Sequence, residues 1–129
     1  MRPHPNITNR YANPEEQRAY LTRLFNEGAK HYDRIDGLGS FGTGPKYRRD
    51  AQRRAGLKPG MKLLDVAAGT GLMAEGAIRL GVKPADIVCL DPSPGMLAET
   101  KRKLGVETVQ GVATEIGRAS CRERVYVLV

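Results

Sequence analysis

The sequence of 129 residues has no tryptophan, only two cysteines and no long hydrophobic run. Cys89 falls in an apolar segment and Cys121 in a polar one, so the cysteines form neither a disulfide framework nor a metal-ligand pattern. No stretch approaches the ~20 apolar residues of a membrane-spanning helix, and the first residues lack the apolar core of a secretory signal. We therefore expect a cytoplasmic protein without a bound metal.

Positive charge is in excess, with a net charge of +7. Such a balance makes nucleic acid or an anionic membrane surface a partner to consider. Much of the excess is local, because seven basic residues and one acidic residue lie between positions 46 and 62. A cluster of this kind is more often a solvated helix face. We expect no specific nucleic acid partner, and a basic nucleic-acid-binding module stays as an alternative.

The first 60 residues favour a helical cover. Residues 1–12 are polar, contain two prolines and are expected to be disordered. Residues 13–60 predict a helix that is capped by Asn13, begins at Pro14 and runs to about residue 30, then a glycine-rich loop, then a second helix from about 45 to 55. In the first helix the spacing of apolar residues predicts packing against the rest of the protein. These residues are Tyr20, Leu21, Leu24, Phe25 and Gly28 or Ala29.

The glycine-rich segment has four glycines between residues 37 and 44 and also holds apolar side chains. That combination is common in loops that cover a ligand, and it also suits a simple connector.

Residues 61–114 predict a parallel sheet. Apolar runs at 62–66, 86–90 and 106–110 alternate with helices at about 71–80 and from Pro94 to about residue 104. Ser93 precedes the second of these helices as a cap, and Gly105 follows it. This order predicts an α/β fold with a truncated Rossmann-like sheet of about three strands.

A short glycine loop organises the rest of the chain. Asp65 lies near the end of the first apolar run, and Gly69, Thr70 and Gly71 follow it. Glycine lets a ligand approach the backbone closely, and the N–H groups of the following helix start would face that ligand. Asp91 closes the second apolar run, twenty positions after Gly71. Two carboxylates at neighbouring strand ends, with a glycine loop between them, are typical of a site for a nucleoside-containing cofactor.

Charge discriminates between the cofactor classes. A phosphate-binding NTPase loop needs a lysine after its last glycine, and none follows Gly71. Residues 69–74 satisfy the dinucleotide pattern, so an NAD-type oxidoreductase stays as an alternative. Asp65 argues against it, because a carboxylate there would repel a pyrophosphate. The same carboxylate suits S-adenosylmethionine, which carries a sulfonium and an ammonium group.

Three motifs resemble class I S-adenosylmethionine-dependent methyltransferases, most closely the C-methyltransferases of ubiquinone and menaquinone biosynthesis. The motifs lie at residues 64–71, at 90–97, and upstream at 25–33 with 40–42. The resemblance spans roughly residues 21 to 114. Because the family sheet has seven strands, it implies that residues 61–114 are the cofactor-binding half of the domain and that this chain alone is inactive and marginally stable.

The resemblance also implies roles for individual residues. It places the methionine part of the cofactor near Asp65, Ala67 and the glycine loop, Asp91 with Pro92 at the ribose, and Met96 under the adenine. Val112 and Ala113 would contact the amino edge of the adenine, through the backbone alone at Val112. Tyr32 and Arg49 are looser candidates, as cofactor cover and carboxylate partner, with packing roles as the alternative. No residue is indicated as the catalytic base, and His31 qualifies only by residue type.

The last residues match a different source. Residues 116–125, Ile-Gly-Arg-Ala-Ser-Cys-Arg-Glu-Arg-Val, are the translation in one reading frame of a widely used short-read sequencing adapter. We therefore expect residues 115–129 to be an artefactual tail. The alternative is a genuine basic tail whose apolar end, residues 125–129, adds an edge strand.

Taken with the resemblance, the sequence predicts methyl transfer from S-adenosylmethionine to a small-molecule acceptor. The resemblance favours a demethyl quinol, reached by peripheral contact with the membrane. The acceptor atom and the oligomeric state are not indicated.

Overall fold

The computed structural model describes residues 13–39, 42–114 and 125–128. The expectations for the N-terminal residues 1–12, for positions 40–41 of the glycine-rich segment, and for residues 115–124 and 129 of the tail, Cys121 included, lie outside the described residues.

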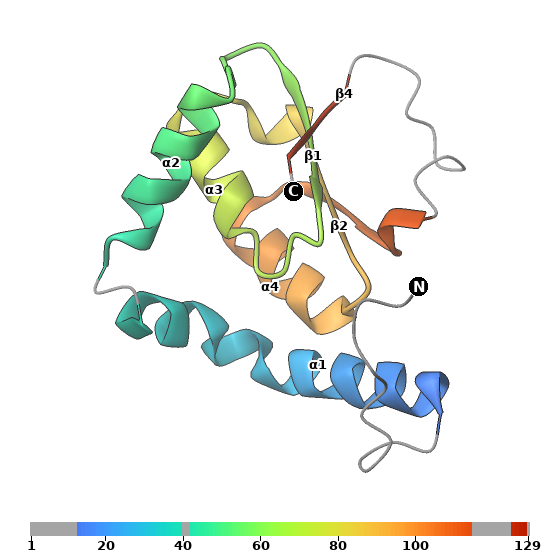
Figure 1. Ribbon diagram of the computed structural model, residues 1–129. Helices are drawn as coiled ribbons and strands as arrows, with labels where there is room; N and C mark the ends of the chain where they lie inside the picture. Colours follow the sequence, from blue (N-terminus) through green and yellow to red (C-terminus); the bar gives the residue numbers. More distant parts are fainter. Residues whose placement is uncertain (1–12, 40–41, 115–124, 129) are drawn as a thin grey trace, which may run out of the picture.

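The described chain alternates helices and strands, with the long helix α1 running past α4 and with α2 beside α3 (Figure 1). The elements are α1 Pro14–Gly39, α2 Gly44–Arg54, β1 Lys62–Val66, α3 Leu72–Arg79, the 3-10 helix η1 Pro84–Asp86, β2 Ile87–Asp91, α4 Pro94–Leu104, β3 Glu107–Gln110 and β4 Val125–Leu128.

The strands form one parallel sheet in the order β3-β2-β1-β4. Val66 of β1 pairs with Leu90 of β2, so Asp65 and Asp91 lie at the same edge of the sheet. The predicted α/β parallel sheet is confirmed, and β1 has a further neighbour in β4, the segment that the alternative interpretation of the tail assigned to an edge strand.

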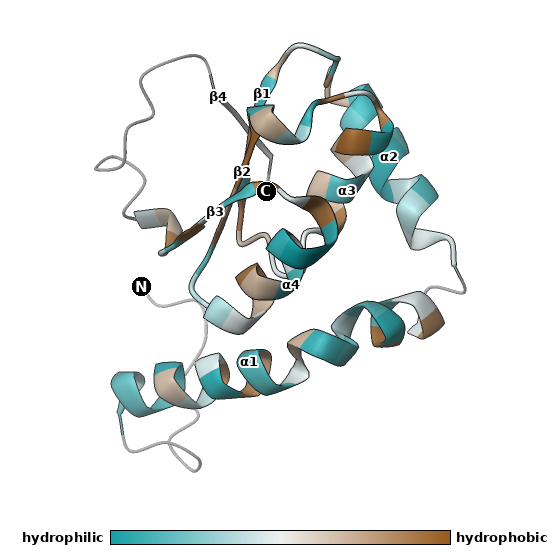
Figure 2. Cartoon of the chain, turned by 180° about the vertical axis from the view of Figure 1, so that it is seen from behind, coloured by the Kyte–Doolittle hydropathy of each residue, from teal (hydrophilic) through white to brown (hydrophobic). Residues whose placement is uncertain are grey.

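Two apolar clusters lie on opposite faces of the sheet. One combines strand residues such as Leu63, Ile87 and Cys89 with Ala74 and Ala77 of α3 and Leu97 of α4. The other consists of strand residues alone: Leu64, Val66 and Leu90, with Val88 and Val109 against them. Figure 2 shows the hydrophobic colour concentrated along β1 and β2, whereas hydrophilic and hydrophobic residues are interspersed on α1. Helices α3 and α4 therefore hold the strand ends in place by apolar packing.

Helix α1 differs from the prediction at its C-terminal end. Its start is confirmed, because the Asn13 side chain accepts a hydrogen bond from the Glu16 N–H at 2.8 Å. The helix does not end near residue 30 but continues to Gly39, through residues expected to form a loop. A Cβ at Gly37 or Gly39 would have open space around it, and Asp36 pairs with Arg48 of α2 at 2.6 Å. Tertiary contacts of this kind override the low helix propensity of glycine.

The face on which α1 packs also differs from the prediction. Ala29 of the predicted apolar pattern is buried, but the larger apolar residues are exposed, with Leu24 at 50% and Phe25 at 45%. The helix also turns the polar Asn26 and Asp33 toward its neighbours. Its attachment is therefore largely polar.

Candidate functional site

Asp65 is a buried carboxylate with an incomplete set of partners. It is 2% exposed near the end of β1, and its Oδ2 atom has no hydrogen-bond partner among the described residues. Burial raises the pKa of Asp65 to about 6, a rise that the Ala74 backbone N–H opposes and the charge of Asp91 reinforces. A buried carboxylate oxygen without a partner is costly unless a ligand donates to it. The site is thus suited to a cationic donor.

Asp91, on the neighbouring strand, has both carboxylate oxygens engaged. Oδ2 accepts a hydrogen bond from the Gly69 N–H at 2.9 Å, and Oδ1 accepts one from the Ser93 N–H at 2.8 Å. These bonds fix the plane of the carboxylate. Each oxygen keeps a further lone pair, so the group can still accept from two adjacent hydroxyls.

The glycine loop between the two carboxylates has an unusual backbone. Ala67, Gly69 and Gly71 all have positive φ, at 58°, 57° and 83°. A Cβ at Gly71 would lie 2.8 Å from the Thr100 Cγ2 atom of α4, so the loop packs too closely there for any side chain. The Thr100 hydroxyl also donates to the Gly69 carbonyl at 2.8 Å. The sequence indicated no role for Thr100 at the site, and its hydrogen bond to the loop is a finding of the structure.

Thr70 connects the loop to α1. This residue is 1% exposed, and its hydroxyl donates to the Asp33 carboxylate. Asp33 is also ion-paired with Lys103 of α4. Asp33 is the last residue of the upstream motif at 25–33, but the sequence indicated no role for it.

The start of α4 lies beside the same loop. The Ser93 hydroxyl caps the helix by accepting from the Met96 N–H at 3.3 Å, as predicted. Asn26 of α1 accepts from the Gly95 N–H at 2.7 Å, and a Cβ at Gly95 would lie 2.8 Å from the Asn26 Cα atom. Met96 is buried at 3% exposure. Helix α1 therefore contacts both the loop and the N-terminus of α4.

The segment after β3 also reaches this edge of the sheet. The Gly111 N–H donates to the Asp91 carbonyl at 3.1 Å, and the Gln110 side chain donates to the Pro92 carbonyl at 3.3 Å. Val112, which follows, is 42% exposed, and Ala113 is exposed as well. The residues expected at the ribose and the adenine thus come from adjacent backbone segments.

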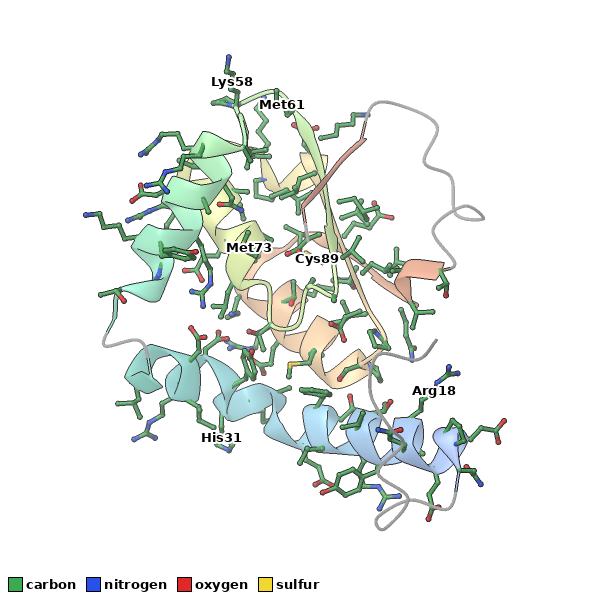
Figure 3. The ribbon with its side chains drawn as sticks, in the orientation of Figure 1. Arg18, His31, Lys58, Met61, Met73 and Cys89 are labelled. Carbon is green, nitrogen blue, oxygen red and sulfur yellow. The ribbon has the colours of Figure 1, made fainter. Side chains whose placement is uncertain are left out.

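The looser candidates lie on the two N-terminal helices, α1 and α2. Tyr32 is 40% exposed on α1, next to Asp33. The stem of Arg49 lies against Gly76 of α3, where a Cβ would be 3.7 Å from its Cγ atom, which suits a packing role. His31 is exposed and points away from the sheet in Figure 3.

The arrangement is chemically selective. Its two carboxylates lie at one edge of the sheet, one fixed by backbone N–H groups and one with a partnerless oxygen. A pyrophosphate would meet negative charge here, whereas a ligand with an ammonium group and a ribose diol would be matched. Among the described residues, no three His, Cys, Asp or Glu side chains gather into a group that could hold a metal ion.

Comparison with known proteins gives consistent matches. The model of the ubiE/COQ5 methyltransferase family matches residues 12–121. The demethylmenaquinone methyltransferase of Parafrankia sp. (strain EAN1pec) is 37% identical over 84 residues, which are 65% of this chain and 32% of that protein. The demethylmenaquinone methyltransferase of Corynebacterium glutamicum (strain R) is 40% identical over 81 residues, which are 63% of this chain and 34% of that protein.

A solved structure of the DhpI–SAH complex matches with a TM-score of 0.53 and 26% identity, over 70% of this chain and 42% of that one. The chain spans about a third of the length of the two curated relatives.

Proposed function

The chain belongs to the ubiE/COQ5 methyltransferase family, and from that premise we propose that its site binds S-adenosylmethionine for methyl transfer to a small-molecule acceptor. A demethyl quinol is the proposed acceptor, because the relatives at 37% and 40% identity are demethylmenaquinone methyltransferases. The chain spans about a third of the length of those relatives, so the methyl transfer itself is proposed for the whole protein.

The observation that carries the proposal is the partnerless oxygen of Asp65. The ammonium group of the cofactor's methionine part would donate to this buried oxygen and satisfy it. The sulfonium would add a second positive charge near the same carboxylate. NAD has no comparable cation at its pyrophosphate, so the charge of the site favours the methyl donor.

In this proposal the remaining residues contact different parts of the cofactor. Asp91, held in plane by the Gly69 and Ser93 N–H groups, accepts from the ribose hydroxyls, with Pro92 beside it. The buried Met96 provides an apolar surface for the adenine, and the backbone at Val112 and Ala113 meets its amino edge. Gly69, Thr70 and Gly71 let the methionine part approach the backbone, with Ala67 in the turn before them.

When bound, S-adenosylmethionine supplies a methyl group on a positively charged sulfur. The acceptor attacks the methyl carbon in line with the carbon–sulfur bond, and the sulfur leaves as a neutral thioether. The described residues contribute by holding that sulfur in one place and by excluding water from it. Helix α1 contributes to this exclusion in our proposal, because Asn26 and Asp33 attach it over the N-terminus of α4 and the glycine loop. Tyr32, one residue before Asp33, would then cover the cofactor.

A quinol acceptor implies access to a lipid surface, and we propose that the protein reaches it peripherally. None of the helices in the described part of the chain is both long and apolar enough to cross a membrane. We also propose a cytoplasmic location, in keeping with the free thiol of Cys89, which is buried in the core.

Isothermal titration calorimetry of the chain with S-adenosylhomocysteine and with NADH tests the proposed cofactor. We expect binding of S-adenosylhomocysteine and none of NADH. Asp65→Asn should weaken S-adenosylhomocysteine roughly tenfold, because it replaces a charged acceptor. Asp86→Asn, at the opposite end of β2, is the matched control and should bind like the wild type. Binding of NADH in place of S-adenosylhomocysteine would contradict the proposal.

A further inference from the structure

A side chain of α1 completes the support of the glycine loop. Three elements that are far apart in sequence meet at the Asp33 carboxylate: the Thr70 hydroxyl donates to one of its oxygens, and the Lys103 ammonium pairs with the other. Helix α1, the loop after β1 and helix α4 are therefore joined by one acidic residue.

We propose that Asp33 is a positioning residue that holds the glycine loop in its binding conformation by accepting the Thr70 hydroxyl hydrogen bond. The consequence for the cofactor rests on the proposed function, whereas the ordering of the loop does not.

The loop needs support from outside its own backbone. Ala67 has a φ of 58°, which for a residue with a side chain persists only where the surroundings enforce it, and the glycines at 69 and 71 leave the backbone free to adopt other conformations. Gly69 is held on both sides, with its N–H bonded to Asp91 and its carbonyl bonded to Thr100. The next residue, Thr70, is fixed through its side chain by Asp33.

Burial makes this contact matter. Thr70 is 1% exposed, so without Asp33 its hydroxyl would lose this acceptor at an almost fully buried position. A buried donor without a partner is penalised by its full desolvation, and the loop would move to relieve it. Lys103 balances the charge of Asp33, and this ion pair lets a carboxylate occupy the contact between α1 and α4.

The test compares five variants with the wild type in the full chain, without ligand, by hydrogen exchange of the amides of residues 67–71. Asp33→Ala and Thr70→Val each remove one side of the hydrogen bond, and we expect each to speed exchange roughly tenfold, as loss of a hydrogen bond to a charged group predicts. The double variant should exchange no faster than either single variant, because both remove the same interaction. Thr70→Ser keeps the hydroxyl and should restore wild-type exchange.

Asp36→Asn is the matched control on the same helix. It weakens the ion pair with Arg48, which ties α1 to α2 and not to the loop, so exchange in the loop should stay unchanged. If Asp33→Ala does not fold, the isosteric Asp33→Asn serves in its place, since it keeps an oxygen acceptor, loses the ion pair with Lys103 and should speed exchange less than Thr70→Val.

Three results would overturn the inference. They are additive effects of Asp33→Ala and Thr70→Val, unchanged loop exchange in Asp33→Ala, and an effect of Asp36→Asn on the loop as large as that of Asp33→Ala. A second measurement, the affinity for S-adenosylhomocysteine, links it to the site: Asp33→Ala should weaken binding roughly tenfold and Thr70→Ser should not. If the wild type fails to bind this ligand, the proposed function fails, while the exchange measurement still decides the role of Asp33.

Discussion

The two acidic strand ends have the same residue type, the same sheet edge and opposite environments. Asp91 has each carboxylate oxygen bonded to a backbone N–H, from Gly69 and from Ser93. Asp65 is more deeply buried and retains an oxygen without a hydrogen-bond partner. The first carboxylate therefore stabilises the protein around it, and the second imposes a cost on the folded state.

This difference separates a supporting role from a binding role. A group whose hydrogen bonds are complete contributes stability whether or not a ligand is present. A buried carboxylate with a raised pKa and a partnerless oxygen destabilises the folded state, and a cationic donor that binds to it offsets this cost. The contrast predicts that substitutions at the two positions change stability in opposite directions.

Asp91→Ala should have the largest effect on stability. It leaves the Gly69 and Ser93 N–H groups without their acceptor and frees the loop, so we expect a loss of about 3–5 kcal/mol in the free energy of unfolding. Urea denaturation followed by circular dichroism measures the change. Asp86→Ala, at the other end of β2, should lose less than about 1 kcal/mol. If Asp91→Ala loses no more stability than Asp86→Ala, Asp91 does not support the loop, and the contrast between Asp91 and Asp65 fails.

Asp65→Asn should stabilise the ligand-free protein at neutral pH. The folded-state pKa of about 6 lies above the ordinary aspartate pKa of 3.8. The contribution of Asp65 to stability is therefore most favourable below pH 4 and declines as pH rises to about 6. Above that pH the buried charge costs about 2–3 kcal/mol, which the neutral amide avoids.

Urea denaturation of Asp65→Asn and wild type at pH 4 and at pH 7.5 measures this gain. The gain should be present at pH 7.5 and nearly absent at pH 4. Destabilisation at pH 7.5 would mean that the Asp65 carboxylate is satisfied in the folded protein, like Asp91.

Cofactor affinity should depend on pH through the same carboxylate. An ammonium group that donates to Asp65 requires the ionised carboxylate, so below pH 6 binding must first remove a proton. We expect the affinity for S-adenosylhomocysteine to fall by up to tenfold per pH unit between pH 6 and pH 4.5, and to be nearly constant above pH 7. Calorimetric titration across this range measures the profile. In Asp65→Asn the profile should be flat, and a wild-type decline that persists in this variant would assign the titration to another group.

Local patterns in the sequence predicted much of the fold. Strand β1 lies where expected, and the caps at Asn13 and Ser93 are formed as predicted, because caps depend on neighbours three residues away. The last turns of α1 were missed because the glycines at 37 and 39 predict a loop. The ion pair of Asp36 with Arg48, which joins these turns to α2, cannot be seen from local sequence.

The site was predicted as a list of residues but not as a set of contacts. The motif around the glycine loop identified Asp65 and Asp91, and sequence spacing gave them similar weight. Only the fold shows that Gly69 and Ser93 each donate to one oxygen of Asp91 and that Thr100 holds the loop from α4. Hydrophobic spacing on α1 included the buried Ala29 but was wrong for the large apolar residues, because that helix is attached by Asn26 and Asp33, whose polar partners have no periodic signal.

The smallest expected effect concerns the loop that separates the two carboxylates. Ala67 has a φ of 58°, a left-handed conformation that costs an L-residue with a side chain about 1–2 kcal/mol. Ala67→Gly removes this strain but adds freedom to the unfolded chain, so we expect a net gain of about 0.5–1 kcal/mol by urea denaturation. Ala51→Gly, inside α2, is the control of opposite sign, with an expected loss of about 1 kcal/mol. If Ala67→Gly is destabilising instead, the alanine side chain makes favourable contacts that outweigh its strain, and the loop owes its shape to packing at Ala67 as well as to its hydrogen bonds with Asp91 and Thr100.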